Sequence, residues 1–285
     1  MIHLTIENEN GSIVMGGQAR DTWRIRAIEG LGPVETEAQT VQYIDSPGQT
    51  TLEVLPRPRT ITITADLNTR EKEQRQWRLS EAMRILNTTG EVTLKVNFSG
   101  KMRKITCRPL PSTLAHFNAA AQEVTISLLA DNPYFRDADT QTVFLRARAD
   151  NLYRGMIFPR VFTYRYTKGT VANLGDVDIE PVIVITAGVL TEEKSGVVLV
   201  NETTGAAIRF NYTLKSGETI TVDIENRTVQ SSRSGNILRY KDRKTVLGNF
   251  VLRPGMNVIR FGLMGDTQPI TAQLSYSNLY AEAVY

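Results

Sequence analysis

Residues 24–35, Arg-Ile-Arg-Ala-Ile-Glu-Gly-Leu-Gly-Pro-Val-Glu, are the stretch on which the expected fold depends most. The first six alternate between charged and apolar side chains, which is typical of a half-buried strand. Gly30 and Gly32 can both adopt a positive φ, while Pro33 fixes its own φ and biases Gly32 away from helical backbone. The stretch therefore predicts a strand that ends abruptly in a constrained turn.

A second stretch of the same kind lies about a hundred residues later. Residues 129–135 read Leu-Ala-Asp-Asn-Pro-Tyr-Phe, an apolar strand that ends at a turn with the aromatic pair Tyr134 and Phe135 behind it. Neither stretch contains a nucleophile, a metal-binding cluster or a phosphate-binding loop. Together they indicate constrained strand ends rather than a reactive site.

Strand patterns continue between these two stretches. Ile61 and Ile63 alternate with threonines, which predicts a half-buried strand. Residues 56–59, Pro-Arg-Pro-Arg, precede it. The two prolines have no backbone N–H to donate to a neighbouring strand, so we expect a strand start or an exposed edge there. Residues 40–44 and 50–55 flank the turn signal Asp-Ser-Pro-Gly and predict a hairpin.

One helix is predicted over residues 69–86. Asn68 is the expected N-cap, and Glu71 stands three residues later, as in a capping box. The apolar positions at helical spacing predict one core-facing stripe, formed by Leu79, Ala82, Met83 and Leu86.

Trp77 falls on nearly the opposite face of this helix. A tryptophan there either meets a second surface, in the same domain or in another subunit, or is simply half exposed. The sequence leaves both alternatives open.

The rest of the chain is predicted to be strands. Residues 92–98 and 102–107 read as a second hairpin, and 123–129 as a further strand, giving an α+β first domain. Residues 137–170 are irregular and read as a packed connection that also supplies a strand to the second domain. From residue 171 the pattern is all β, which predicts a β-sandwich or jelly roll with strands at 182–186, 197–201, 207–211, 219–224, 235–240, 249–252, 256–261 and 271–276.

Composition argues against catalysis and against nucleic-acid recognition. The apolar fraction of 41% suits a globular protein, and the net charge is only +3, located in residues 151–285. One basic cluster, residues 239–244, is either a solvated turn, which we favour, or a polyanion site.

Two histidines, His3 and His116, and one cysteine, Cys107, have no metal-ligand spacing. Cys107 lies in a strand pattern and is expected to be buried and inert. We therefore predict no enzyme, no catalytic residues, no metal and no cofactor.

The N-terminus lacks a signal peptide, and the longest apolar run is too short to span a bilayer, so we expect synthesis in a cytoplasm and no membrane insertion.

Taken in order, the motifs cover nearly the whole chain. They are the two opening stretches, the Pro-Arg strand start at 58–63, the hairpin at 100–105, the segment 173–183, and the turns at 201–205, 217–223 and 252–257. In this order the chain resembles the distal tail protein (Dit) family of long-tailed, non-contractile phages.

The resemblance implies a mainly β protein. Residues 1–136 would form an α+β, ring-forming tail domain with a helix and a hairpin belt, residues 137–170 the packed connection, and residues 171–285 a galectin-like β-sandwich. Six copies would form a ring that joins the tail tube to the tail tip and lets DNA pass through its lumen. The implied partners are further copies of the chain, the tail tube protein, and tail-tip, tail-associated or receptor-binding proteins. The implied location is the tail tip of the virion, after synthesis in the bacterial host cytoplasm.

Five residues are candidates for a subunit or domain interface: Arg57, Arg59, Trp77, Tyr134 and Phe135. The alternative is a carbohydrate-binding sandwich, since such scaffolds often bind sugars. A sugar site usually needs an exposed aromatic platform, yet both tryptophans, Trp23 and Trp77, lie in the first domain. An enzyme is a distant third possibility.

Overall fold

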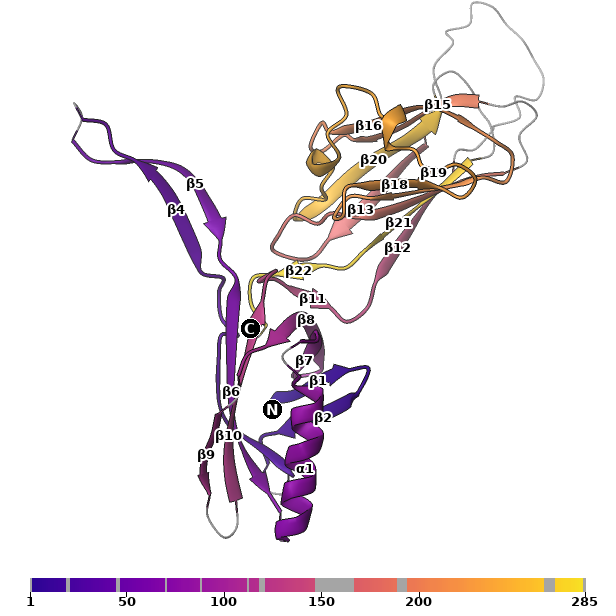
Figure 1. Cartoon of the computed structure of the whole chain (residues 1–285). Helices are drawn as coiled ribbons and strands as arrows, with labels where there is room; N and C mark the ends of the chain where they lie inside the picture. Colours follow the sequence, from indigo (N-terminus) through magenta and orange to yellow (C-terminus); the bar gives the residue numbers. More distant parts are fainter. Residues whose placement is uncertain are drawn as a thin grey trace, which may run out of the picture. The chain divides into compact units, whose positions relative to one another are not determined.

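The structure is a computed structural model of the 285-residue chain. It describes residues 2–18, 21–44, 47–69, 71–87, 89–111, 113–117, 121–146, 167–188, 194–263 and 270–283. The described residues are mainly β with one α-helix, as predicted from the sequence (Figure 1). They fold as two compact units, Met1–Ala138 with Tyr280–Tyr285 and Asp139–Leu279. Tyr280–Tyr285 thus joins the first unit, whereas the sequence assigned all of 171–285 to the sandwich.

The first unit is built on a closed barrel of seven strands. Six neighbouring pairs run in the order β8-β7-β1-β2-β3-β6-β10, and a pairing of β10 with β8 closes the ring. All pairs are antiparallel except β2 with β3, which meet at the single parallel pair Gly16↔Arg24. The barrel strands are β1 (Ile2–Asn8), β2 (Gly11–Gly16), β3 (Trp23–Glu29), β6 (Arg59–Asn68), β7 (Val92–Phe98), β8 (Lys101–Pro109) and β10 (Ala121–Ala130).

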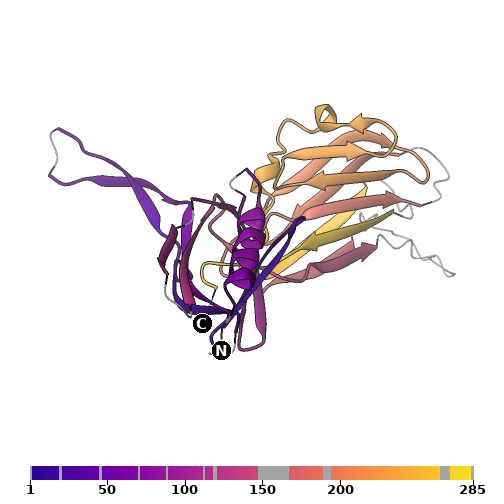
Figure 2. The ribbon, with the colours of Figure 1, turned by 60° about the horizontal axis from the view of Figure 1, so that its bottom comes forward.

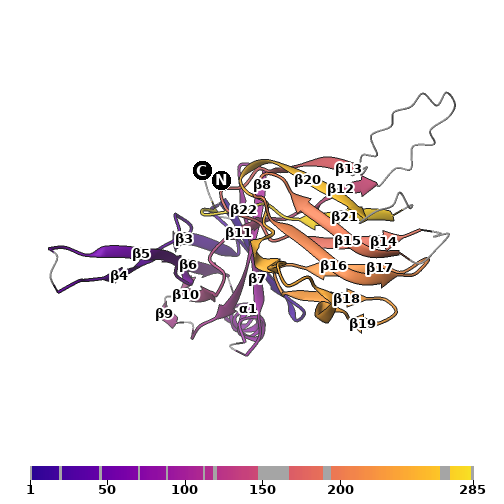
Figure 3. The same ribbon diagram turned by 90° about the horizontal axis from the view of Figure 1, so that it is seen from above.

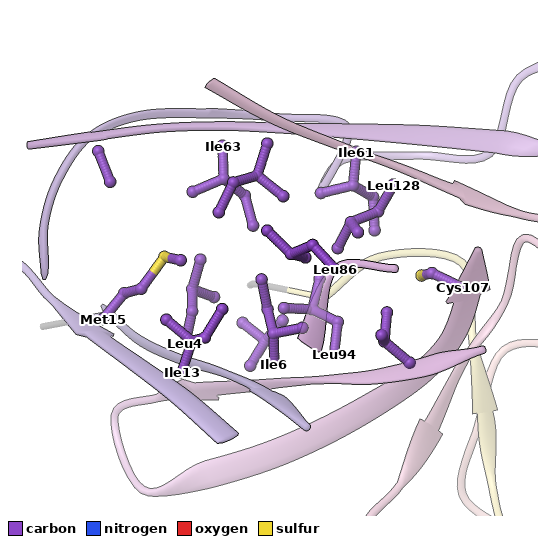
Figure 4. Packing of buried hydrophobic residues seen from close by; sticks show 14 of the residues in the cluster. Leu4, Ile6, Ile13, Met15, Ile61, Ile63, Leu86, Leu94, Cys107 and Leu128 are labelled. Carbon is purple, nitrogen blue, oxygen red and sulfur yellow. The ribbon is translucent and has the colours of Figure 1, made fainter. Parts of the chain in front are cut away.

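Alternation explains which side chains fill this barrel. On β6, Ile61 and Ile63 are fully buried, while the alternating Thr60 is exposed and Thr62 and Thr64 are half-buried, as predicted. Figure 4 shows these side chains meeting Leu4, Ile6 and Leu94 from the opposite strands. The predicted hairpin between β7 and β8 is confirmed, and it turns at Ser99 and Gly100, which both have positive φ.

Further short strands extend the barrel sheet at its edges. They are β9 (Thr113–Phe117), β11 (Phe135–Asp137) and β22 (Leu279–Tyr280). The two-stranded hairpin of β4 (Thr36–Val41) and β5 (Thr50–Pro56) belongs to no larger sheet of the described chain. It confirms the predicted hairpin, except that its first strand runs over 36–41 rather than 40–44.

The helix α1 (Lys72–Ile85) lies against the barrel, as Figure 2 shows. It begins later than predicted, because Asn68 is still in β6 and donates its backbone N–H to Thr22. Glu71 is the N-cap residue and makes no side-chain capping bond. The predicted capping box is therefore wrong.

The buried face of α1 also differs from the predicted stripe. Ala82 and Leu86 are buried as expected, but Ile85 takes the place predicted for Met83, whose exposure is 36%. The reason is at the end of the helix, where Asn8 binds the carbonyl oxygen of Ile85 at 2.8 Å and Leu86 enters the barrel core.

The second unit consists of two antiparallel sheets, whose strands Figure 3 shows side by side. Six strands form the order β12-β21-β14-β17-β18-β19 and four form β13-β20-β15-β16. Their bounds are β12 (Gln141–Arg146), β13 (Thr167–Asn173), β14 (Val182–Ala187), β15 (Lys194–Asn201), β16 (Ala207–Leu214), β17 (Thr219–Asp223), β18 (Thr228–Ser231), β19 (Gly235–Asn236), β20 (Gly255–Leu263) and β21 (Ile270–Tyr276).

The predicted connection over residues 137–170 is described only at its two ends. Residues 147–166 lie outside the described residues. The described ends supply strands to the second unit, since β12 pairs with β21 and β13 pairs with β20.

Two predicted strands of the second unit are wrong. Residues 235–240 contain only the two-residue β19, followed by the 3₁₀ helix η1 (Leu238–Tyr240). Residues 249–252 leave the 3₁₀ helix η2 (Leu247–Asn249) and make a single bridge, Ile179↔Leu252. In both places buried side chains, Ile237 and Leu252, produce an alternating pattern without a neighbouring strand to pair with.

The core of the second unit contains one notable buried acid. Glu218 is fully buried and accepts hydrogen bonds from Tyr212 Oη at 2.6 Å, from the Lys215 N–H at 2.9 Å and from Ser231 Oγ. Burial alone would raise the pKa of Glu218, but these hydrogen bonds outweigh burial and hold the pKa below its usual range. The carboxylate therefore stays ionised inside the fold.

Candidate assembly surface

The β4–β5 hairpin, called the arm below, is the part of the first unit with the fewest contacts of its own. Its two strands pair only with each other among the described strands, and every residue of β5 is exposed. Figures 1 and 2 show the arm leaving the barrel at the start of β6. A two-stranded hairpin is at best marginally stable alone in water, and both of its edges offer unpaired backbone groups. The arm is therefore built like a segment that a further surface completes.

The two faces of the arm differ in chemistry. The cross-strand pairs Thr36↔Pro56 and Ala38↔Val54 lie on one face, while Glu37↔Leu55 and Gln39↔Glu53 lie on the other. Leu52 is the extra residue of a bulge and follows Val54 on the first face by alternation.

Apolar exposure on the arm is high. Leu52 is 62% exposed and Val54 55%. Nearer the tip, Tyr43 is 58% exposed and Ile44 is completely exposed. Exposed apolar side chains gathered in this way are typical of a protein contact surface. Sequence reasoning found this hairpin but not its exposure, because alternating Val and Leu residues read equally well as a strand inside a sheet.

Arg57 lies at the root of the arm. Its guanidinium is paired with Glu37, with both N···O distances at 3.2 Å, and its backbone N–H donates to the carbonyl of Glu35 at 2.8 Å. Both side chains of the ion pair are more than half exposed. The pair helps to set the direction of the arm and leaves Arg57 accessible.

Arg59, two residues later, is buried, with 7% exposure. Its guanidinium donates to the carbonyl oxygens of Gly30 and Gly32, each at 2.6 Å, and of Pro133 at 2.8 Å. A fourth bond, at 2.6 Å, reaches the carbonyl of Ala281. Burial lowers the pKa of Arg59, but an arginine remains charged in this environment. One side chain thus joins the two stretches that the sequence singled out, and holds the returning C-terminal segment as well.

Gly30 explains the shape of the first turn in physical terms. Its φ is +85°, and a Cβ added there would lie 2.2 Å from the carbonyl oxygen of Thr60. Gly32 has an ordinary φ and open space around it, so only one of the two glycines uses the left-handed region. The close approach at Gly30 places its carbonyl under the guanidinium of Arg59.

The aromatic pair of the second stretch divides in two. Phe135 is fully buried, and the Arg59 guanidinium lies 5.0 Å from its ring centroid. Tyr134 is half-buried, and its backbone N–H is held by the side chain of Asn132 at 3.2 Å. Phe135 and Arg59 therefore form part of the core of the first unit, and Tyr134 lies at its surface.

The C-terminal segment Tyr280–Ala283 completes this core. Besides Ala281, the carbonyl of Glu282 accepts a bond from Arg103, and the N–H of Ala283 donates to Leu31 at 2.9 Å. The Arg103 guanidinium also stacks 3.6 Å from the centroid of the Tyr280 ring. Sequence reasoning missed this return, because contacts with backbone carbonyls leave no residue pattern.

Trp77 is 58% exposed on α1, and its ring lies under the neighbouring Arg78 guanidinium at 4.6 Å. The structure brings Arg59 and Phe135 together and puts Arg57 next to them along the chain. It records no contact between Trp77 and the other four candidates within the described residues.

None of the arrangements in the described residues resembles a catalytic site. Burial raises the pKa of Cys107 to about 12, which keeps the thiol protonated. No group of three or more His, Cys, Asp and Glu side chains in the described ranges could hold a metal ion. No helix in that same part of the chain is both long and apolar enough to cross a bilayer.

Known proteins show the same fold. Residues 174–280 match the family described as siphovirus-type tail component, C-terminal domain. The solved structure of phage SPP1 Dit (gp 19.1), described as a paradigm of the hub adsorption apparatus in phages that infect Gram-positive bacteria, is similar with a TM-score of 0.68. The identity is 13%, over 97% of this chain and 99% of that one.

Two structures of the phage P2 baseplate in its activated conformation are also similar. The form with Ca gives a TM-score of 0.53 at 12% identity and the form with Sr gives 0.54 at 11% identity, each over 98% of both chains. No curated protein matches the sequence. Residues 174–280 therefore resemble the C-terminal domain of siphovirus-type tail components, and the chain as a whole has the fold of the SPP1 Dit structure.

Proposed function

We propose that this protein is the distal tail hub, assembling as a hexameric ring that joins the tail tube to the tail-tip proteins and lets DNA pass through its lumen. The observation that carries the proposal is the arm. It presents an apolar face and two open strand edges that the described part of its own chain does not cover. A neighbouring subunit in a closed ring would cover the same face in every copy.

The division of the chain into two units supports separate roles for its two halves. The ring would be built by residues 1–136, whose barrel gives the arm a rigid base. Residues 171–285 would be a galectin-like sandwich, linked through 137–170, facing the tail-tip, tail-associated or receptor-binding proteins. Two antiparallel sheets and the family match over 174–280 support this part of the proposal.

The arm offers a direct test of assembly. Sedimentation velocity and negative-stain electron microscopy of the purified full chain should show rings with a central hole. Leu52→Asp combined with Val54→Asp should shift the protein to monomers, because two charges would have to be desolvated at the contact. Gln39→Asp combined with Leu55→Asp is the matched control, since it adds two charges to the face that already carries Glu53. Monomers of the unaltered protein at all concentrations, or rings that persist in the double variant, would refute the role of the arm.

Trp77 supplies an independent test of the interface. Because it is 58% exposed, Trp77→Ala should leave the fold intact. A well-packed interface tryptophan is often a hot spot, and its truncation can cost about 2 kcal/mol or more of binding. Weakened assembly of this variant would place α1 at a subunit contact, and unchanged assembly would leave Trp77 as a solvent-exposed residue.

The carbohydrate-binding alternative gains one observation. Phe144 on β12 is 63% exposed and pairs across the sheet with Gln273, an aromatic ring beside an amide. Glycan-array binding that disappears in Phe144→Ala would favour this function for the second unit. Absence of glycan binding by rings of the full chain would leave the hub alone.

A further inference from the structure

The basic cluster of residues 239–244 is only partly used by the fold. Arg239 lies 4.8 Å from the centroid of the Tyr240 ring and bonds its hydroxyl at 2.9 Å. Lys241 donates to the carbonyl of Thr245 at 2.6 Å. Arg243 and Lys244 remain exposed. The cluster is therefore not one uniform solvated turn, because its cations differ in how far the fold engages them.

Lys244 lines a surface cavity of about 260 Å³ in the second unit. The opposite wall is the beginning of β16, where Arg209 points outward from the edge strand of the four-stranded sheet. The other lining residues are small or neutral: Gly205, Ala206, Ala207, Thr245, Val246 and Asn249. Among the described residues that line the cavity there are two cations and no acid.

The two walls are fixed to each other by backbone bonds. The buried Thr245 hydroxyl accepts the N–H of Arg209 at 3.0 Å, and the N–H of Asp242 donates to the carbonyl of Arg209 at 2.9 Å. The side chains of Arg209 and Lys244 form no ion pair within the part of the chain that the structure describes. Two like charges are thus held at one cavity without a counter-ion from these residues.

The groups at the cavity suit a tetrahedral oxyanion. A guanidinium offers a planar fork of N–H donors and an ammonium offers a mobile point charge. Asn249, which also lines the cavity, adds an uncharged amide. A cavity of this size is slightly smaller than the sites of drug-sized ligands, which favours one phosphate group or one unit of a polymer. We propose that the cavity between Arg209 and Lys244 binds phosphate-bearing anions.

The sequence around the cavity supplies a matched control. Arg243 and Lys244 are adjacent, exposed and equally charged, but only Lys244 lines the cavity. Lys244→Gln and Arg243→Gln change the net charge by the same amount, so non-specific attraction of anions by the basic surface affects both variants equally. Arg209→Gln tests the opposite wall, and its backbone bonds to Thr245 and Asp242 do not depend on the side chain.

Isothermal titration calorimetry of the full chain with inorganic pyrophosphate at low ionic strength is the direct test. We expect binding that weakens on addition of NaCl, because salt screens exposed charges. Lys244→Gln and Arg209→Gln should each weaken it by about threefold to fivefold, the size of one exposed charge contact, and Arg243→Gln by much less. Absence of binding to the unaltered protein, or equal weakening in Arg243→Gln and Lys244→Gln, would overturn the proposal.

A second experiment identifies which kind of molecule carries the phosphate. Co-sedimentation with phosphatidylcholine vesicles containing phosphatidylglycerol, and with vesicles of phosphatidylcholine alone, tests a lipid headgroup. Binding to the anionic vesicles that Lys244→Gln reduces and Arg243→Gln does not would identify a headgroup. Binding of pyrophosphate without vesicle binding would identify a soluble or polymeric phosphate.

Discussion

Replacing Arg59 with methionine should destabilise the first unit more than any change at an exposed arginine. The substitution keeps the length of the apolar stem but removes the donors to the carbonyls of Gly30, Gly32, Pro133 and Ala281. The bond to Pro133 is buried, and the other three are partly buried. Water can therefore replace only some of the lost bonds.

The expected magnitude follows from these environments. A buried acceptor left without a donor costs about 1–3 kcal/mol, while each acceptor that water can reach costs a few tenths to about 1 kcal/mol. Loss of the cation–π contact with Phe135 adds about 1 kcal/mol. Release from the cost of burying the guanidinium offsets part of the total. We expect a loss of about 3 kcal/mol in the free energy of unfolding.

Tryptophan fluorescence during urea denaturation measures this unit selectively. The chain has two tryptophans, Trp23 and Trp77, and both lie in the first unit, with Trp23 only 5% exposed. Arg57→Met is the control, because the Arg57 side chain makes an exposed ion pair and its loss should leave the urea midpoint almost unchanged. Equal losses in the two variants, or a loss below about 1 kcal/mol for Arg59→Met, would contradict the role of Arg59 as the joint between the two stretches.

Three further predictions concern single sites. Gly30→Ala should destabilise the first unit by more than about 2 kcal/mol, because φ is +85° and the added Cβ meets a carbonyl at 2.2 Å, while Gly32→Ala should be nearly neutral in the same urea assay. Because the pKa of Glu218 is lowered by folding, the carboxylate stabilises the folded state fully above its unfolded pKa of about 4.3, and this stabilisation is lost as the pH falls through the folded pKa. Glu218→Gln should therefore be much less stable than the unaltered protein at pH 7. The difference in stability should shrink below about pH 4, as measured by circular dichroism. Cys107, with its pKa raised to about 12, should not react with a thiol reagent at pH 8 until urea unfolds the first unit, and rapid labelling of the native protein would contradict its burial.

Local patterns predicted much of the fold. The alternation of Ile61 and Ile63, the β7–β8 turn at Ser99 and Gly100, and the burial of Cys107 all depend on neighbours in the sequence, and the structure confirms them. The closed barrel could not be predicted. It closes where Leu128 and Leu129 of β10 pair with residues of β8 about twenty positions earlier, and nothing in the sequence near these residues indicates that pairing.

The candidate interface residues show the same limit. The sequence named Arg59 and Phe135 among five candidate interface residues, and the structure brings these two into contact in the core of the first unit. Whether a residue is exposed depends on the whole fold. A sequence pattern can therefore mark a residue as constrained without showing whether it is buried or exposed. For the same reason the apolar face of the arm, with Leu52 and Val54, could not be predicted from the sequence.

The return of Tyr280–Ala283 to the first unit bears on how the protein is made. Chains leave the ribosome N-terminus first, at about 5–20 residues per second. Ala281 follows Arg59 by 222 residues, so translation separates the two by about 10 to 45 seconds. During this interval the whole of the second unit, Asp139–Leu279, is synthesised while Arg59 and Arg103 still lack their last acceptors. The unit that is synthesised first is therefore the one completed last.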